Sequence, residues 1–257
     1  MRRIFLMTWM LVLFLPPTFV FGQNVGPQEI ITKFAQKESE FRNLWEKYTY
    51  TQKVEFQVLG RSGAVKERRM MEIEVYFTTE GKRQTRVLYD RGELRSLQVT
   101  KEDIGDAVGL QPFVLTTEQL PEYDIKYEGE ERVDELDTYV FEVEPKKIDK
   151  KKRYFQGRLW VDKVDFQIVM TRGKAVPDLG SNKFPAFETV REQIDGVYWF
   201  PTWTKADDVL DFGRGNQHHV RMFITYENFK KFEVGTSIKY GKVEGEPEPK
   251  QEEKKPE

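Results

Sequence analysis

From residue 48 onward, apolar and polar side chains alternate with a period of two, in one short segment after another. The segments recur about every ten to fifteen residues as far as residue 229, and turn residues at 60–63, 80–81 and 195–196 separate them. This period is typical of a β-strand with one apolar face. The strand-like segments do not alternate with helical segments, so a parallel α/β fold is not expected.

We expect about eleven strands in an antiparallel meander. Their ranges are 48–58, 71–77, 85–89, 94–99, 123–132, 138–144, 154–162, 166–172, 187–194, 198–205 and 220–229. Residues 90–92 (Asp-Arg-Gly) are expected to separate the third strand from the fourth. Residues 101–120 interrupt the pattern, and we expect a short helix and an apolar loop there.

Residues 27–48 follow a different period. Seven apolar side chains recur at steps of three and four residues: Ile30, Ile31, Phe34, Phe41, Leu44, Trp45 and Tyr48. This spacing predicts a helix with one aromatic face, and Pro27 suits its first turn.

A long antiparallel sheet twists and curls, so it must close, split into two sheets or have its concave face covered. The N-terminal helix and residues 104–115 are the available covers. We therefore predict a mainly β (α+β) fold: a curved antiparallel half-open β-barrel of about eleven strands, with the N-terminal helix and a helical lid on its concave face. This shape leaves an apolar cavity between sheet and cover.

The two ends of the sequence have their own character. Residues 1–22 have the pattern of a secretory signal peptide: Arg2 and Arg3 precede an apolar run, and the small residues Val20 and Gly22 precede the expected cut. An uncleaved anchor is the alternative. We expect export to a periplasm, or secretion, with residues 23–235 forming the half-barrel domain. Residues 236–257, rich in Pro, Glu and Lys, predict a disordered charged tail.

Composition removes most catalytic chemistry. The chain has no cysteine, which excludes disulfides, thiolate metal sites and cysteine nucleophiles. Its net charge is -2, so it lacks the excess of basic residues that is typical of nucleic-acid-binding domains. His218 and His219 are neighbours at the start of the last predicted strand, and neighbours on a regular strand point to opposite faces, so the two cannot both face one metal ion. With Asp207, Asp208 and Asp211 they would form at most a loose cation site. We expect no enzyme, no catalytic residues, no metal and no cofactor.

A basic run lies between two predicted strands, where Lys146, Lys147, Lys150, Lys151, Lys152 and Arg153 surround Asp149. One interpretation is that this hairpin loop is simply solvated. The other is that its positive charge attracts an anionic membrane surface, or a membrane-bound protein that donates or accepts the cargo. We expect a monomer.

The chain is rich in aromatic residues, at 14%. Aromatic and methionine side chains suit a pocket that adapts to a flexible acyl chain, and the alternative is an ordinary core. Six residues are our candidates for lining an apolar ligand cavity: Trp45, Phe56, Phe77, Phe113, Trp160 and Trp199.

Three segments carry a family resemblance: EKYTYTQKVEFQV at 46–58, GRLWVDKVDFQIVMTRG at 157–173 and FETVREQIDGVYWFPTWTKADD at 187–208. Together with the signal pattern, they resemble the periplasmic outer-membrane lipoprotein-sorting proteins, the LolA-like carriers with their LolB- and RseB-type relatives. The resemblance implies a non-enzymatic protein that holds lipoprotein or lipid acyl chains between sheet and lid. It also implies transfer to the outer membrane, although some relatives sense envelope stress.

This sequence departs from that family in two ways. It has no cysteine for a lipid anchor, so a soluble carrier fits better. The arginine that holds the carrier's lid is matched by neither Arg83 nor Arg86, nor by any other arginine here. Two other functions stay open: a protein-binding module or envelope-stress sensor that uses its convex face, and a hydrolase with carboxylates at 207–211.

Overall fold

The computed structural model describes residues 25–109, 113–178 and 183–232. The predicted signal peptide and tail lie outside this range. In the described part of the chain, none of the helices is both long enough and apolar enough to cross a membrane.

The chain begins with helix α1 (Pro27–Trp45) and continues through three strands, β1 (Tyr48–Leu59), β2 (Val65–Phe77) and β3 (Arg83–Glu93). Helix α2 (Lys101–Gly109) and the short 3-10 helix Leu120–Glu122 follow. The remaining strands are β4 (Tyr123–Val133), β5 (Leu136–Pro145), β6 (Tyr154–Asp162), β7 (Ile168–Val176), β8 (Phe187–Gln193), β9 (Trp199–Asp211) and β10 (Gln217–Lys231).

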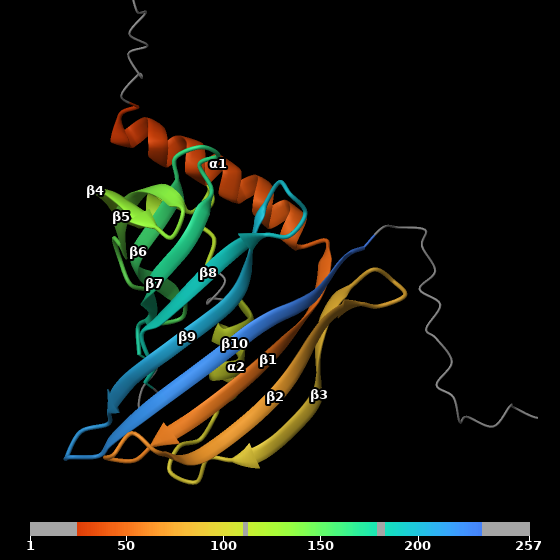
Figure 1. Ribbon diagram of the computed structural model, residues 1–257, viewed down its shortest axis with the longest axis vertical. Helices are drawn as coiled ribbons and strands as arrows, with labels where there is room; N and C mark the ends of the chain where they lie inside the picture. Colours follow the sequence, from red (N-terminus) through yellow and green to blue (C-terminus); the bar gives the residue numbers. More distant parts are fainter. Residues whose placement is uncertain (1–24, 110–112, 179–182, 233–257) are drawn as a thin grey trace, which may run out of the picture.

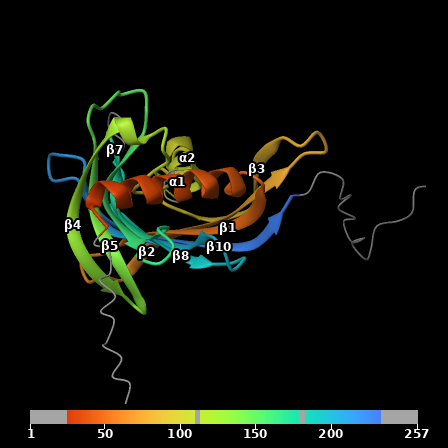
Figure 2. The ribbon, with the colours of Figure 1, turned by 90° about the horizontal axis from the view of Figure 1, so that it is seen from above.

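The strands described form one open antiparallel sheet of ten, in the order β3-β2-β1-β10-β9-β8-β7-β6-β5-β4. The first strand pairs with the last, and the two edges, β3 and β4, are consecutive in sequence. The connection between them must therefore cross a whole face of the sheet, and it carries α2. Figure 2 shows the sheet curved into a crescent with α1 and α2 inside the curve. The predicted half-open barrel with a helical cover is confirmed.

The main core lies between α1 and the concave face of the sheet. Phe34 of α1 packs on Phe141 of β5, with ring centroids 5.4 Å apart, and Phe41 meets Phe200 of β9 edge-on at 5.4 Å. These rings are fully buried. The predicted helix with one aromatic face is confirmed. It ends at Trp45, three residues before the predicted end.

A second, smaller apolar cluster lies on the outer face of the sheet. It contains Val140, Trp160, Val169 and Met170, with Val190 and Trp199 among the residues packed against it. Because directly paired residues of neighbouring strands share a face, the register places Val140, Trp160, Met170, Val190 and Trp203 in one row across β5 to β9. Both faces of this part of the sheet are therefore apolar.

One predicted strand is wrong. Residues 94–99 alternate but form no strand, and β3 runs through Asp90-Arg91-Gly92, which were expected to end it. Gly92 permits this because its φ is +86° and a Cβ there would lie 2.2 Å from the carbonyl oxygen of Arg68. The chain then leaves the sheet edge, and residues 94–100 cover part of the concave face instead.

Candidate functional site

A cavity of about 360 Å³ lies between the concave face and the segment that joins β3 to α2. It occupies the end of the sheet that carries the β9–β10 hairpin, away from α1 (Figure 1). Most of its lining is apolar: Phe56, Leu94, Leu97, Val99, Ala175, Phe184, Pro185, Phe187, Leu210, Phe212, Val220 and Met222. These residues come from five strands and three connections, so the cavity is a product of the curved sheet and its cover.

Residues 94–100 are held over the cavity at both ends. At the β3 end, the carboxylate of Glu67 accepts hydrogen bonds from the backbone N–H of Arg95 (2.8 Å) and of Ser96 (3.0 Å), and from the Ser96 hydroxyl (2.9 Å). These bonds, led by that from the Ser96 N–H, lower the pKa of Glu67. At the α2 end, Thr100 and Asp103 cap the helix reciprocally.

Helix α2 is fixed to the sheet by two polar contacts. Asp106 is paired with the guanidinium of Arg153 from the β5–β6 loop, with 2.7 Å between Oδ2 and Nη2. The buried amide of Gln52 on β1 donates to the carbonyl of Ala107 at 3.1 Å. Arg153 also lies over the Phe184 ring at 3.9 Å, so this arginine ties the cover to the cavity wall.

A buried ion pair joins α1, the sheet and the residues after α2. Arg191 of β8 donates from Nη1 to both carboxylate oxygens of Glu38, at 3.0 and 3.1 Å, and from Nη2 to the carbonyl of Phe113. Both charged side chains are fully buried. Burial raises the pKa of Glu38, while the Arg191 charge and the Ile168 N–H oppose that rise.

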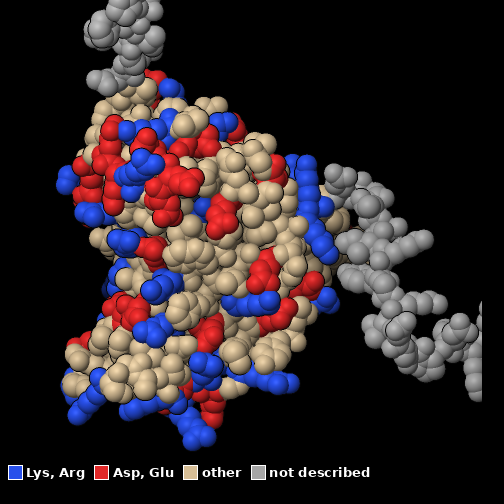
Figure 3. Space-filling view, in the orientation of Figure 1, with Lys and Arg blue, Asp and Glu red and all other residues tan. Residues whose placement is uncertain are grey.

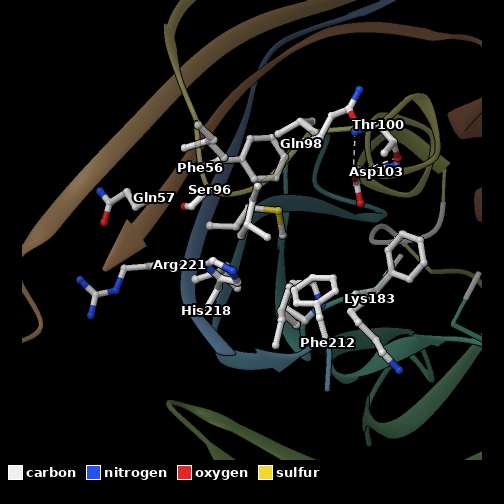
Figure 4. A pocket seen from close by; sticks show the side chains of 18 of the residues that line it. Phe56, Gln57, Ser96, Gln98, Thr100, Asp103, Lys183, Phe212, His218 and Arg221 are labelled. Carbon is white, nitrogen blue, oxygen red and sulfur yellow. Dashed lines mark hydrogen bonds between the residues drawn. The ribbon is translucent and has the colours of Figure 1, made fainter. Parts of the chain in front are cut away.

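The cavity wall also carries ionisable side chains. Burial raises the pKa of Asp103, whereas its hydrogen bonds from Thr100 lower it. Lys183 is bound to Asp178 at 2.8 Å, and His218 is bound through Nε2 to the side-chain oxygen of Asn216 at 2.8 Å. In Figure 4 the Lys183 side chain points away from Asp103.

The two histidines point to opposite faces, as the alternation predicts. His218 lines the cavity, whereas His219 is bound to Asp207 on the other face, which also binds Arg221. Figure 4 shows the Arg221 side chain extending away from the cavity residues. Within the described ranges, no group of three or more His, Asp and Glu side chains could hold a metal ion. The alternative of a loose cation site with Asp208 and Asp211 therefore finds no support among these residues.

The six predicted ligand residues are not together. Phe56 lines the cavity, and Phe113 stacks on Phe155 at 4.4 Å in the core nearby. Trp45 packs in the α1 core, and Phe77 stacks on Phe232 at 4.4 Å.

Trp160 and Trp199 belong to the outer cluster, and their indole N–H groups donate to Glu131 and Asp165. Direct contact of the six residues with a ligand stays a prediction.

Sequence reasoning missed most of the lining. Leu94, Leu97 and Val99 were assigned to a strand, and Phe184 and Phe212 lie in connections that carry no periodic pattern. The usable signal was the apolar content of these connections, because an exposed loop seldom contains so many large apolar side chains.

The basic loop is only partly free. Arg153 is half-buried and paired with Asp106, and Lys152 is paired with Glu122. Four lysines of the loop are exposed: Lys146, Lys147, Lys150 and Lys151. On the outer face of the sheet, basic and acidic side chains are interspersed (Figure 3).

No family model matches the chain, and the search of curated proteins finds no match. Solved structures that are similar to it include the following three. A DUF1329 family protein from Desulfovibrio piger is 17% identical over 78% of this chain and 92% of that chain, with a TM-score of 0.37. A LolA superfamily protein from Nitrosomonas europaea is 13% identical over 76% and 94%, with a TM-score of 0.32. An outer membrane lipoprotein-sorting protein domain from Vibrio parahaemolyticus is 9% identical over 79% and 93%, with a TM-score of 0.37.

All three similarities are remote. At identities below 25% and TM-scores below 0.5, they carry no argument about a ligand. The case for a function has to come from the cavity itself.

Proposed function

We propose that this protein is exported to the periplasm and, without catalysis, holds an acyl chain of a lipid or lipoprotein in the cavity under residues 94–100 and α2. The observation that carries the proposal is the cavity's lining of aliphatic, aromatic and methionine side chains between a rigid sheet and a separate cover. Its volume, about 360 Å³, falls within the range of about 300–1,000 Å³ usual for small-molecule pockets.

The energetics favour an acyl chain over a compact polar ligand. Each buried methylene contributes roughly 0.8 kcal/mol, so about ten of them contribute roughly 8 kcal/mol before the cost of association is subtracted. Phe56 and Met222 lie side by side on the cavity wall, as paired residues of β1 and β10, and a methionine side chain repacks readily around a flexible chain. Transfer of the cargo to a membrane-bound acceptor, with the exposed lysines of the β5–β6 loop as the contact, extends the same proposal.

Two measurements test it. Mass spectrometry of natively purified protein should find co-purified acyl lipid, and an uncharged fluorescent dye, N-phenyl-1-naphthylamine, should bind and be displaced by lipid. Val220→Lys, which places an ammonium at the half-buried cavity wall, should weaken dye binding at least about tenfold. The control is Val209→Lys at an exposed position of β9, which should bind like the wild type. Absence of lipid together with equal dye binding by the two variants would refute the proposal.

A second candidate function is a protein-binding module that uses the outer face. The apolar row that begins at Val140 continues to the half-buried Trp203, and the exposed Phe223 lies on the next strand. A photo-crosslinker at residue 203 that captures one defined protein in the native host would favour this function if one at Glu118 captures none. Glu118 is exposed and lies on the concave side, next to the contact between Thr117 and Ser39 of α1. Capture at both positions, or at neither, would count against it.

A further inference from the structure

One carboxylate on the cavity wall, that of Asp103, has an oxygen to which none of the residues in the described ranges donates a hydrogen bond. Oδ2 of Asp103 accepts hydrogen bonds from the backbone N–H (2.7 Å) and the hydroxyl (2.9 Å) of Thr100. The Asp103 N–H in turn donates to the Thr100 hydroxyl at 3.2 Å, so the side chain is fixed in place. Among the described residues none donates to Oδ1.

The other carboxylate on the wall, that of Asp106, is paired with an arginine. Asp106, one turn further along α2, receives the Arg153 guanidinium on both oxygens, at 3.3 and 2.7 Å. The charges that act most strongly on Asp103 are those of Asp106 and Glu102, and both add negative potential there. Asp103 is therefore the wall carboxylate whose charge is left uncompensated.

The basic side chains of the wall, Lys183, His218 and Arg221, are each bound to a group other than Asp103. Lys183 pairs with Asp178, and its side chain points away from Asp103 (Figure 4). The imidazole of His218 is bound to Asn216. A ligand head beside Asp103 thus meets a hydrogen-bond acceptor and a negative potential, without a cation to balance a second negative charge.

We propose that Asp103 selects the polar end of the acyl ligand, favouring an uncharged head with a hydroxyl or amide N–H donor over a carboxylate or phosphate head. The donor would fill the open position on Oδ1, and the chain would extend into the apolar part of the cavity. An anionic head would place two negative charges in a partly desolvated site, which is unfavourable. This inference rests on the proposed function, because it concerns the same cavity.

The test compares three ligands that share one chain and differ in the head: 1-monolauroylglycerol, lauramide and laurate. Each displaces N-phenyl-1-naphthylamine from the delipidated full-length protein at about pH 7.5, where laurate and free aspartate are ionised. The hydroxyl and amide ligands should bind at least about tenfold tighter than laurate. In Asp103→Asn, which keeps an acceptor for Thr100, laurate should gain at least about fivefold and the preference should shrink.

The matched control is Glu135→Gln, the same change of charge at an exposed position of the β4–β5 turn, away from the cavity, which should keep the wild-type preference. Circular dichroism and the unfolding midpoint confirm that both variants fold. If all three ligands displace the dye equally well, the inference is wrong while the proposed function stands. If laurate binds tightest and Lys183→Gln removes that preference, the head lies at Lys183 and the inference is overturned. If none of them displaces the dye and no lipid co-purifies, the proposed function itself fails.

Discussion

Arg191→Met removes the cation at the centre of the fold's buried ion pair. In the wild type this arginine contacts Glu38 of α1, the carbonyl of Phe113 beside the cover and the Phe41 ring, whose centroid lies 4.9 Å from the guanidinium carbon. The substitution therefore loosens α1 and the cover from the sheet together. It also leaves a carboxyl group buried without its partner.

The expected loss is large. Removing one partner of a buried ion pair destabilises a protein by about 3–5 kcal/mol. For a domain of this size, each kcal/mol shifts the melting temperature by roughly 2–4 °C, so the melting temperature should fall by roughly 6–20 °C. Arg158→Met is the matched control, because Arg158 is half exposed and pairs with Glu128 at 2.7 Å on the surface. It should lose no more than about 1 kcal/mol.

The loss should also depend on pH. Burial raises the pKa of Glu38, and the Arg191 charge holds that rise back. Without Arg191 the folded-state pKa moves further above the unfolded value of about 4.3. A group with a raised pKa stabilises the fold only below its unfolded pKa, and that stability is lost as pH rises toward the folded pKa. The loss is about 1.4 kcal/mol per pH unit.

Urea unfolding at about pH 5 and about pH 7.5 measures both effects. Arg191→Met should be less stable at the higher pH, relative to the wild type. The double variant Arg191→Met/Glu38→Gln has no carboxyl left to titrate, so its stability relative to Glu38→Gln should be the same at both pH values. The reasoning is refuted if Arg191→Met stays within about 1 kcal/mol of the wild type at the higher pH, or if the double variant keeps the same pH dependence.

Three further predictions concern separate parts of the molecule. Gly105→Ala should stabilise α2 by about 0.5–1 kcal/mol, because a Cβ there meets nothing within 4 Å; hydrogen exchange of the α2 amides would show slower opening. Glu67→Ala should speed amide exchange in residues 94–100 while the global unfolding midpoint hardly moves; unchanged exchange would mean that the apolar contacts alone hold this segment. The hydrogen bond with His219 is the main cause that lowers the pKa of Asp207, so this carboxylate stabilises the fold above about pH 4, and the stability is lost as pH falls through its lowered pKa. Asp207→Asn should therefore cost more stability at neutral pH than near pH 3, measured by urea midpoints.

The sequence predicted the sheet well and the cavity poorly. Strand positions follow from alternation, which is a local property of each segment. In β6, however, Leu159 and Val161 face the core while Trp160 between them faces the outer cluster. Where both faces are apolar, alternation does not tell which face is concave, so Trp160 and Trp199 were grouped with residues of the other face.

The sequence by itself determined one amphipathic helix, a long antiparallel meander and the lack of cysteine chemistry, because side-chain direction and residue chemistry are fixed locally. Tertiary structure alone decided that the first strand pairs with the last, which makes β3 and β4 the edges and sends their connection across the concave face. That crossing turns residues 94–100 from an apparent strand into a cover. It also creates the cavity, and the fold around it joins Glu38 to Arg191. Neither outcome has a local signal, because both depend on contacts between residues far apart in the chain.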